Sequence, residues 1–140
     1  ERLATAVRTE NSLPDRVYEV AILAVGVAWR AQFEWYAHER IARKAGVASE
    51  AFPLLQANVD PRQLVGILRD DELAAYTFSR ELALTKRVSD ETYAATKAAL
   101  GGNRAMADLA LTVACYHGVS VLLNSFAVAL PEGAERPFPE

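Results

Sequence analysis

The run VYEVAILAVGVAW, residues 17–29, constrains the fold more than any other part of the chain. Its thirteen residues are apolar or small except for one acid, Glu19. A helix that is apolar nearly all the way round has to be covered by other elements on most sides. Pro14 and Asp15 stand just before the run, at positions that suit the first turn of a helix. We therefore expect a central helix here, with the rest of the chain packed around it.

The rest of the sequence is also punctuated as helices. Residues 32–44 are amphipathic and end at Gly46 with bases in the last turn. The valines fall within alanine-rich helical patterns, and no run bounded by turns has the character of a strand. The first residues, 1–12, have the pattern of a helix end followed by a loop. The sequence thus predicts an all-α fold of about six helices: the one opened by SLPDR (12–16), 32–44, a short one from Ser49, 70–87, 90–100 and 103–126.

Length and charge exclude several classes of protein. A chain of 140 residues suits one domain, residues 1–140, with 131–140 as a proline-rich extended tail. The missing initial methionine is compatible with a truncated N-terminus. A net charge of −3 offers no basic surface for nucleic acid or anionic lipid. No unbroken apolar run reaches the roughly 18 residues of a membrane span. The single cysteine, Cys115, cannot form an internal disulfide, which favours a reducing, cytoplasmic location.

Three ionisable residues near the first two helices are candidates for acid–base chemistry. Glu34 and His38 are four residues apart and so share a helix face. Glu19 lies on the preceding helix, and it can reach that face if the two helices form a hairpin. Burial raises the pKa of a carboxyl group and a neighbouring acid raises that of a histidine, which together would give a proton donor and acceptor near neutral pH.

Simpler interpretations of the same residues stay open. A Glu–His pair at this spacing is often only a surface pair, and Glu19 could instead cap a helix or pair with Arg16 or Arg30. Two acids with one or two histidines also resemble a carboxylate-rich metal site. Helical di-metal sites, however, typically use Glu-x-x-His on paired helices, and this sequence has one pair at i, i+4. We therefore expect no metal.

The spacing of these residues resembles a known family signature. The peroxidase branch of the carboxymuconolactone decarboxylase and alkylhydroperoxidase D-like superfamily has the pattern Glu-x11-Cys-x2-Cys-x3-His. This sequence is similar to it, with the same intervals between Glu19, Ala31, Glu34 and His38. The stretches FEWYAHERIARKAGVASEAF and ACYHGVSVLLNSFAVALPEGA resemble a cysteine-free branch of the superfamily. The resemblance covers most of residues 13–134 and implies an alkylhydroperoxidase D-like helical bundle.

The resemblance also implies what the chain does and does not do. Ala31 and Glu34 replace the two cysteines of the peroxidase branch, and Cys115 has no CxxC partner, so a disulfide-based peroxidase is disfavoured. The decarboxylase branch acts on small lactone or carboxylic acids by proton transfer without a cofactor. By that analogy His38 is the expected proton donor or electrophile, Glu19 orients it or shuttles the proton, and Glu34 tunes it or accepts the proton.

The chemistry of the expected substrate and the family resemblance suggest further site residues and partners. A carboxylate substrate favours an arginine, which Arg16, Arg30 or Arg104 could supply. The resemblance implies assembly into trimers or hexamers. The alternative to an enzyme is a non-catalytic or ligand-binding homo-oligomeric scaffold that lost the CxxC site. Side chains expected to line a substrate pocket are Trp35, Tyr36, Tyr116 and His117.

Overall fold

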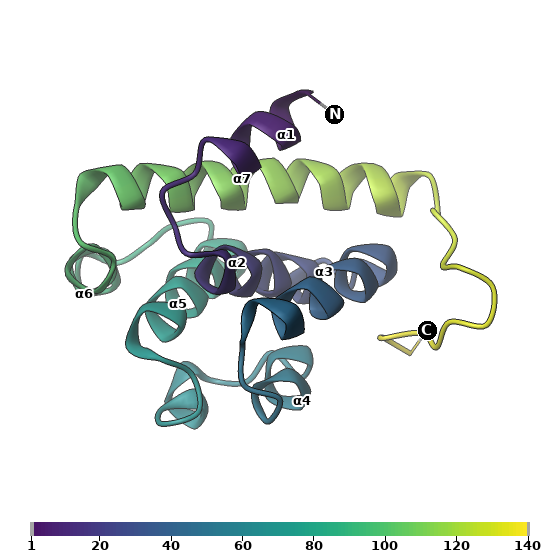
Figure 1. Cartoon of the computed structure of the whole chain (residues 1–140), viewed down its shortest axis with the longest axis horizontal. Coiled ribbons are helices and arrows are strands. Elements are labelled where there is room, and N and C mark those ends of the chain that lie inside the picture. The colour runs from purple at the N-terminus through teal and green to yellow at the C-terminus, as the bar shows by residue number, and fades with distance from the viewer. Residues whose placement is uncertain (1, 140) are drawn as a thin grey trace.

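The computed structural model describes residues 2–139, and within them the protein is all-α, as predicted (Figure 1). Seven α-helices and one 3-10 helix follow one another without a strand in that range. The α-helix that the sequence did not predict is the first one in the chain, residues 2–9, where the sequence indicated only a helix end. The elements are α1 (Arg2–Thr9), α2 (Asp15–Ala28), α3 (Gln32–Ala45), α4 (Ala51–Gln56), the 3-10 helix η1 (Pro61–Leu64), α5 (Asp70–Thr85), α6 (Asp90–Leu100) and α7 (Asn103–Ser125).

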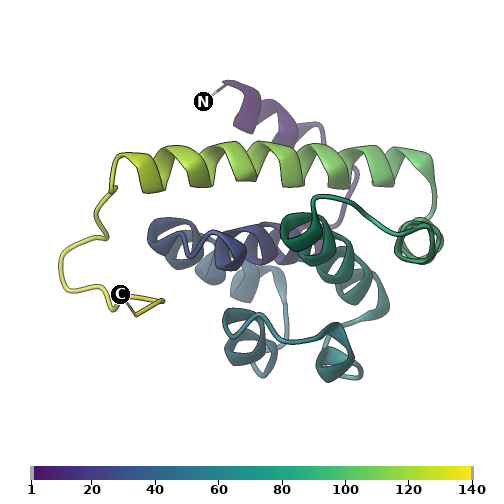
Figure 2. The ribbon, with the colours of Figure 1, turned by 180° about the vertical axis from the view of Figure 1, so that it is seen from behind.

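Helix α2 is the central helix that its composition predicts. Every residue from Val17 to Val27 is buried, including Glu19. The helix packs against α3, α5 and α7, which lie around it in both the front and the rear view (Figure 2). Two apolar clusters share it, because its opposite faces contact different partners: Leu23 packs in the cluster with α3 and α4, and Ile22 in the cluster with α5 and α7.

A tight connection folds α3 back along α2. Arg30 adopts the left-handed conformation, with φ of 48°, between the two helices. Gly26 lets the helices approach closely, because a Cβ there would lie 3.3 Å from Cγ of Glu34. Helix α3 ends at Gly46, whose φ of 94° is a conformation that glycine adopts without strain. The hairpin required by the sequence argument is therefore present.

Helix α7 is a long rod on one side of the molecule, and α1 lies on its outer side (Figure 1). By length and composition α7 could cross a membrane, the one such helix in residues 2–139, with a mean hydropathy of 1.5 over 18 residues. The sequence prediction of no span counted only unbroken apolar runs, and Thr112 and His117 interrupt this one. A single helix of this kind is weak evidence for a membrane span, and 39% of the window is buried within the protein.

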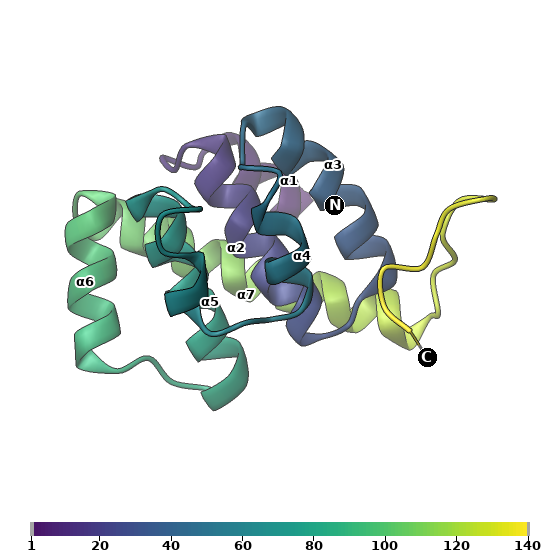
Figure 3. The same cartoon turned by 90° about the horizontal axis from the view of Figure 1, so that it is seen from below.

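The tail after α7 is non-helical, as expected, but it returns to the body and packs there. Phe138 is only 3% exposed and meets the ring of Trp35 edge-on at 5.7 Å. The side chain of Gln32 donates to the carbonyl of Phe138 at 2.7 Å and accepts from its N–H at 3.0 Å. Seen from below, the tail curves back from the end of α7 toward the start of α3 (Figure 3).

Candidate functional site

The hairpin brings Glu19, Glu34 and His38 together, and we call these three residues the acid–histidine cluster. Nδ1 of His38 lies 2.7 Å from Oε2 of Glu19, a hydrogen-bonding distance. Nε2 of the same ring lies 3.7 Å from Oε1 of Glu34, which is too long for a hydrogen bond. Glu19, rather than the helical neighbour Glu34, is thus the acid that holds the imidazole. With Glu19 ionised, Nδ1–H donates to it and Nε2 is left facing Glu34.

Glu19 is a buried carboxylate with both oxygens occupied. Its side chain is 1% exposed, and Arg8 donates to Oε1 while His38 occupies Oε2. A buried carboxylate is costly without such partners. The pairing with Arg16 or Arg30 that the sequence left open is not the one formed. Arg8 escaped sequence reasoning because it belongs to α1, eleven residues earlier, and no local spacing rule connects it to α2.

Glu34 is the unpaired member of the cluster. Its residue is 2% exposed, and neither carboxyl oxygen has a hydrogen-bond partner within residues 2–139. Burial, together with the negative charge of Glu19, raises the pKa of Glu34 to about 8. The group is therefore mainly a neutral carboxylic acid at pH 7. It can donate a proton, and no acceptor in residues 2–139 receives it.

Two tyrosines adjoin the cluster, Tyr116 against His38 and Tyr18 against Tyr116. The ring of Tyr116 stands edge-on to the imidazole with 5.1 Å between ring centroids. The hydroxyl of Tyr18 donates to that of Tyr116 at 3.3 Å. Burial raises the pKa of both phenols, so both stay protonated. The structure thus brings Tyr116, one of the predicted substrate-binding residues, against His38, and it adds Tyr18, which the sequence did not indicate although it adjoins Glu19.

The other three residues predicted to line a pocket lie apart from the cluster. Trp35 is buried in the core and donates from Nε1 to Glu39 at 2.9 Å. Tyr36 accepts from Arg40 at 2.6 Å. His117 accepts from Trp29 through Nδ1, and burial lowers its pKa. Trp35 and Tyr36 do border a different pocket, of about 520 Å³, between α3 and the tail.

The three arginines proposed for a substrate carboxylate are engaged elsewhere. Both terminal nitrogens of Arg16 bind Asp71 at 2.6 Å. Arg30 donates to the backbone carbonyl of Pro139, and Arg104 pairs with Asp108 at 3.1 Å. The guanidinium that reaches the cluster is that of Arg8 instead.

The structure gives Cys115 little thiolate character. It is a half-buried free cysteine on α7, and burial, with the charge of Glu34, raises its pKa. No group of three or more His, Cys, Asp or Glu residues in the described part of the chain is placed to hold a metal ion.

Comparison with known proteins shows which protein family the chain resembles. The family model described as "Carboxymuconolactone decarboxylase family" matches residues 1–67, the segment that contains Glu19, Glu34 and His38. Comparisons with curated proteins and with solved structures returned no match. The match over residues 1–67 and the all-helical bundle together support the similarity of this chain to the carboxymuconolactone decarboxylase and alkylhydroperoxidase D-like superfamily.

Proposed function

We propose that the chain is a cofactor-independent, decarboxylase-like enzyme that moves a proton to or from a small lactone or carboxylic acid. The observation that carries this proposal is Glu34. A buried carboxyl group with a pKa near 8 and no partner for either oxygen is costly to the fold, and it stands next to the free nitrogen of a positioned histidine. The hydrogen-bonding capacity of such a group is unused within residues 2–139, which supports a role in chemistry rather than in folding.

The residues divide the proton transfer among them. In a decarboxylation the bond between the substrate carbon and its carboxylate breaks, carbon dioxide leaves, and the electron pair remains as an enolate. Nε2 of His38 takes the proton of Glu34 and delivers it to that carbon. The Glu19 carboxylate on Nδ1 stabilises the positive charge that His38 carries in between. Water then returns a proton to Glu34.

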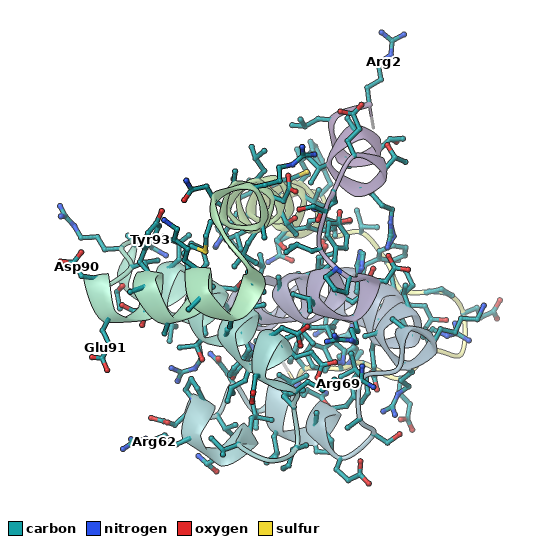
Figure 4. All side chains as sticks on the ribbon, turned by 60° about the vertical axis from the view of Figure 1, so that its left-hand side comes forward. Arg2, Arg62, Arg69, Asp90, Glu91 and Tyr93 are labelled. Carbon is teal, nitrogen blue, oxygen red and sulfur yellow. The ribbon has the colours of Figure 1, made fainter. Side chains whose placement is uncertain are left out.

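The test uses carboxymuconolactone as the probe, in deuterium oxide. We expect release of carbon dioxide and one deuterium at the product carbon, both followed by NMR. Glu34→Gln and His38→Ala should each lower kcat by about a hundredfold or more, the usual contribution of a positioned acid or base. Glu91→Gln, on the exposed surface of α6, is the control and should leave kcat unchanged (Figure 4). Full turnover in both cluster variants would refute the proposal.

A second candidate is a non-catalytic or ligand-binding homo-oligomeric scaffold. The observation that favours it is that Glu19 and His38 are already paired within the protein. Under this alternative the cluster is a structural network, so neither cluster variant changes any turnover, and carboxymuconolactone is not consumed by the wild type.

We also propose that the chain assembles with copies of itself, as a trimer or hexamer, in the cytoplasm. Exposed apolar side chains along and just beyond α7 support self-association, because such a patch favours burial. An unpaired cysteine supports a reducing location. Analytical ultracentrifugation tests the assembly, and a monomer at micromolar concentration would contradict it. The exposed residues concerned are Leu111, Val121, Leu122, Phe126 and Val128.

A further inference from the structure

Arg8 is the most exposed of the side chains that contact the acid–histidine cluster. The side chains of Glu19 and Glu34 are each 1% exposed, and that of His38 is 13% exposed. Tyr18 is buried as well. The side chain of Arg8, by contrast, is 40% exposed, and its guanidinium binds Glu19. Arg8 therefore offers a charged group to a molecule in solvent while it contacts the cluster.

Arg8 is carried by helix α1, none of whose residues is fully buried. The helix packs chiefly against the outer side of α7, and its Val7 packs against the apolar cluster shared by α2, α5 and α7. Asn11 and Ser12, in the segment that joins α1 to α2, hydrogen-bond to Thr112 and Asp108 of α7. Because the Arg8 side chain is itself 40% exposed, turning its guanidinium away from Glu19 requires no movement of this backbone. Its other contact is with the ring face of Tyr18, whose centroid lies 5.4 Å from Cζ of Arg8.

The guanidinium also has unused capacity for an anion. Arginine has five N–H donors in a fork that matches a carboxylate. Within residues 2–139 its hydrogen-bond acceptor is a single oxygen, Oε1 of Glu19, reached through Nη2. Glu19 would keep its other oxygen on His38 if Arg8 turned away. The position of the imidazole therefore does not depend on Arg8.

We propose that Arg8 is the receptor for the carboxylate of an anionic ligand, and that this carboxylate displaces Glu19 from the guanidinium. The ligand class, a small carboxylic or lactone acid, rests on the proposed function. The exchange gives Arg8 a new carboxylate in place of Glu19 and places the bound acid next to His38, while Glu19 gives up its ion pair at Oε1 and keeps the contact of Oε2 with His38. The assignment differs from the sequence candidates Arg16, Arg30 and Arg104, all of which are engaged elsewhere.

The test compares two probes that differ in charge and by one methyl group. One is 5-oxotetrahydrofuran-2-carboxylate, a lactone acid, and the other is its uncharged methyl ester, with both dissociation constants measured by calorimetry. The wild type should bind the acid more tightly. Arg8→Gln should weaken acid binding by roughly tenfold to a hundredfold and leave the ester unaffected, while Arg8→Lys restores part of the preference. Arg2→Gln is the matched control, since Arg2 extends from the same helix into solvent and should keep the preference (Figure 4).

Glu19→Gln separates this role from a merely structural one. Removing the resident competitor should tighten acid binding several-fold, whereas loss of a structural ion pair would not tighten it. The inference is overturned if the wild type does not prefer the acid, if Arg8→Gln keeps the preference, or if Glu19→Gln binds the acid no more tightly. Binding is measured without turnover, so the two proposals can fail separately. If the wild type does not turn over carboxymuconolactone but its preference for the acid is lost in Arg8→Gln, the decarboxylase proposal is refuted and the assignment of Arg8 is supported.

Discussion

Replacing Glu34 by glutamine should stabilise the protein at neutral pH, although the residue is buried. The pKa of Glu34 is about 8 in the fold, against its ordinary value of 4.5. Between these values the folded protein retains a proton that the unfolded chain releases, so the free energy of unfolding falls as pH rises. The slope is about 1.4 kcal/mol per pH unit. The wild type therefore loses about 3 kcal/mol by pH 7, and the loss levels off at about 5 kcal/mol above pH 8.

Glutamine has nearly the same shape and no titrating proton, so Glu34→Gln avoids this loss. Urea unfolding at fixed protein concentration, followed by circular dichroism at pH 5, 6, 7 and 8, measures the difference between variant and wild type. From pH 5 to pH 7 the variant should gain about 2.5 kcal/mol relative to the wild type. Glu91→Gln, on the surface, should differ from the wild type by less than about 0.5 kcal/mol at every pH. A difference for Glu34→Gln that is independent of pH would refute the reasoning.

Three further predictions concern packing and access. Phe138→Ala should lower the free energy of unfolding, measured in urea, by about 3 kcal/mol, because Phe138 is buried. Phe126 is 76% exposed, so Phe126→Ala should change the free energy of unfolding by less than about 0.5 kcal/mol. Equal effects of the two substitutions would contradict the packing of the tail against the body. Gly26→Ala should lower kcat on carboxymuconolactone, because the new methyl group meets Cγ of Glu34 at 3.3 Å, and unchanged kcat would show that Glu34 yields without consequence. Cys115 should react with a thiol reagent at pH 7 more slowly in the folded protein than in urea, and equal rates would contradict its raised pKa.

The sequence predicts those parts of the fold that depend on local pattern. The apolar run around Glu19 predicts a central helix, and the composition predicts an all-α chain. The spacing of Glu34 and His38 places them on one face of α3. The hairpin of α2 and α3, which brings Glu19 to that face, was an assumption of the sequence analysis. The structure contains it, and the absence of a side chain at Gly26 allows the two helices to approach closely.

What the sequence does not predict depends on contacts between distant segments. Arg8 reaches Glu19 from a helix of which the sequence indicated only the end. Phe138 fills a space beside α3 that exists only after folding, so its burial has no local signal. His117 adjoins Tyr116 in sequence but turns to Trp29, because successive residues of a helix point about 100° apart.

Direct titration of the Glu34 carboxyl tests the central claim, that a neutral acid stands beside a histidine held by Glu19. Protein labelled with ¹³C at the glutamate side-chain carboxyls, with Glu34→Gln used to assign the signal, gives the pKa of this group by NMR. We predict a midpoint near 8 in the folded protein. A midpoint near the ordinary value of 4.5 would mean that Glu34 is ionised at neutral pH, and the proposed proton source would not exist.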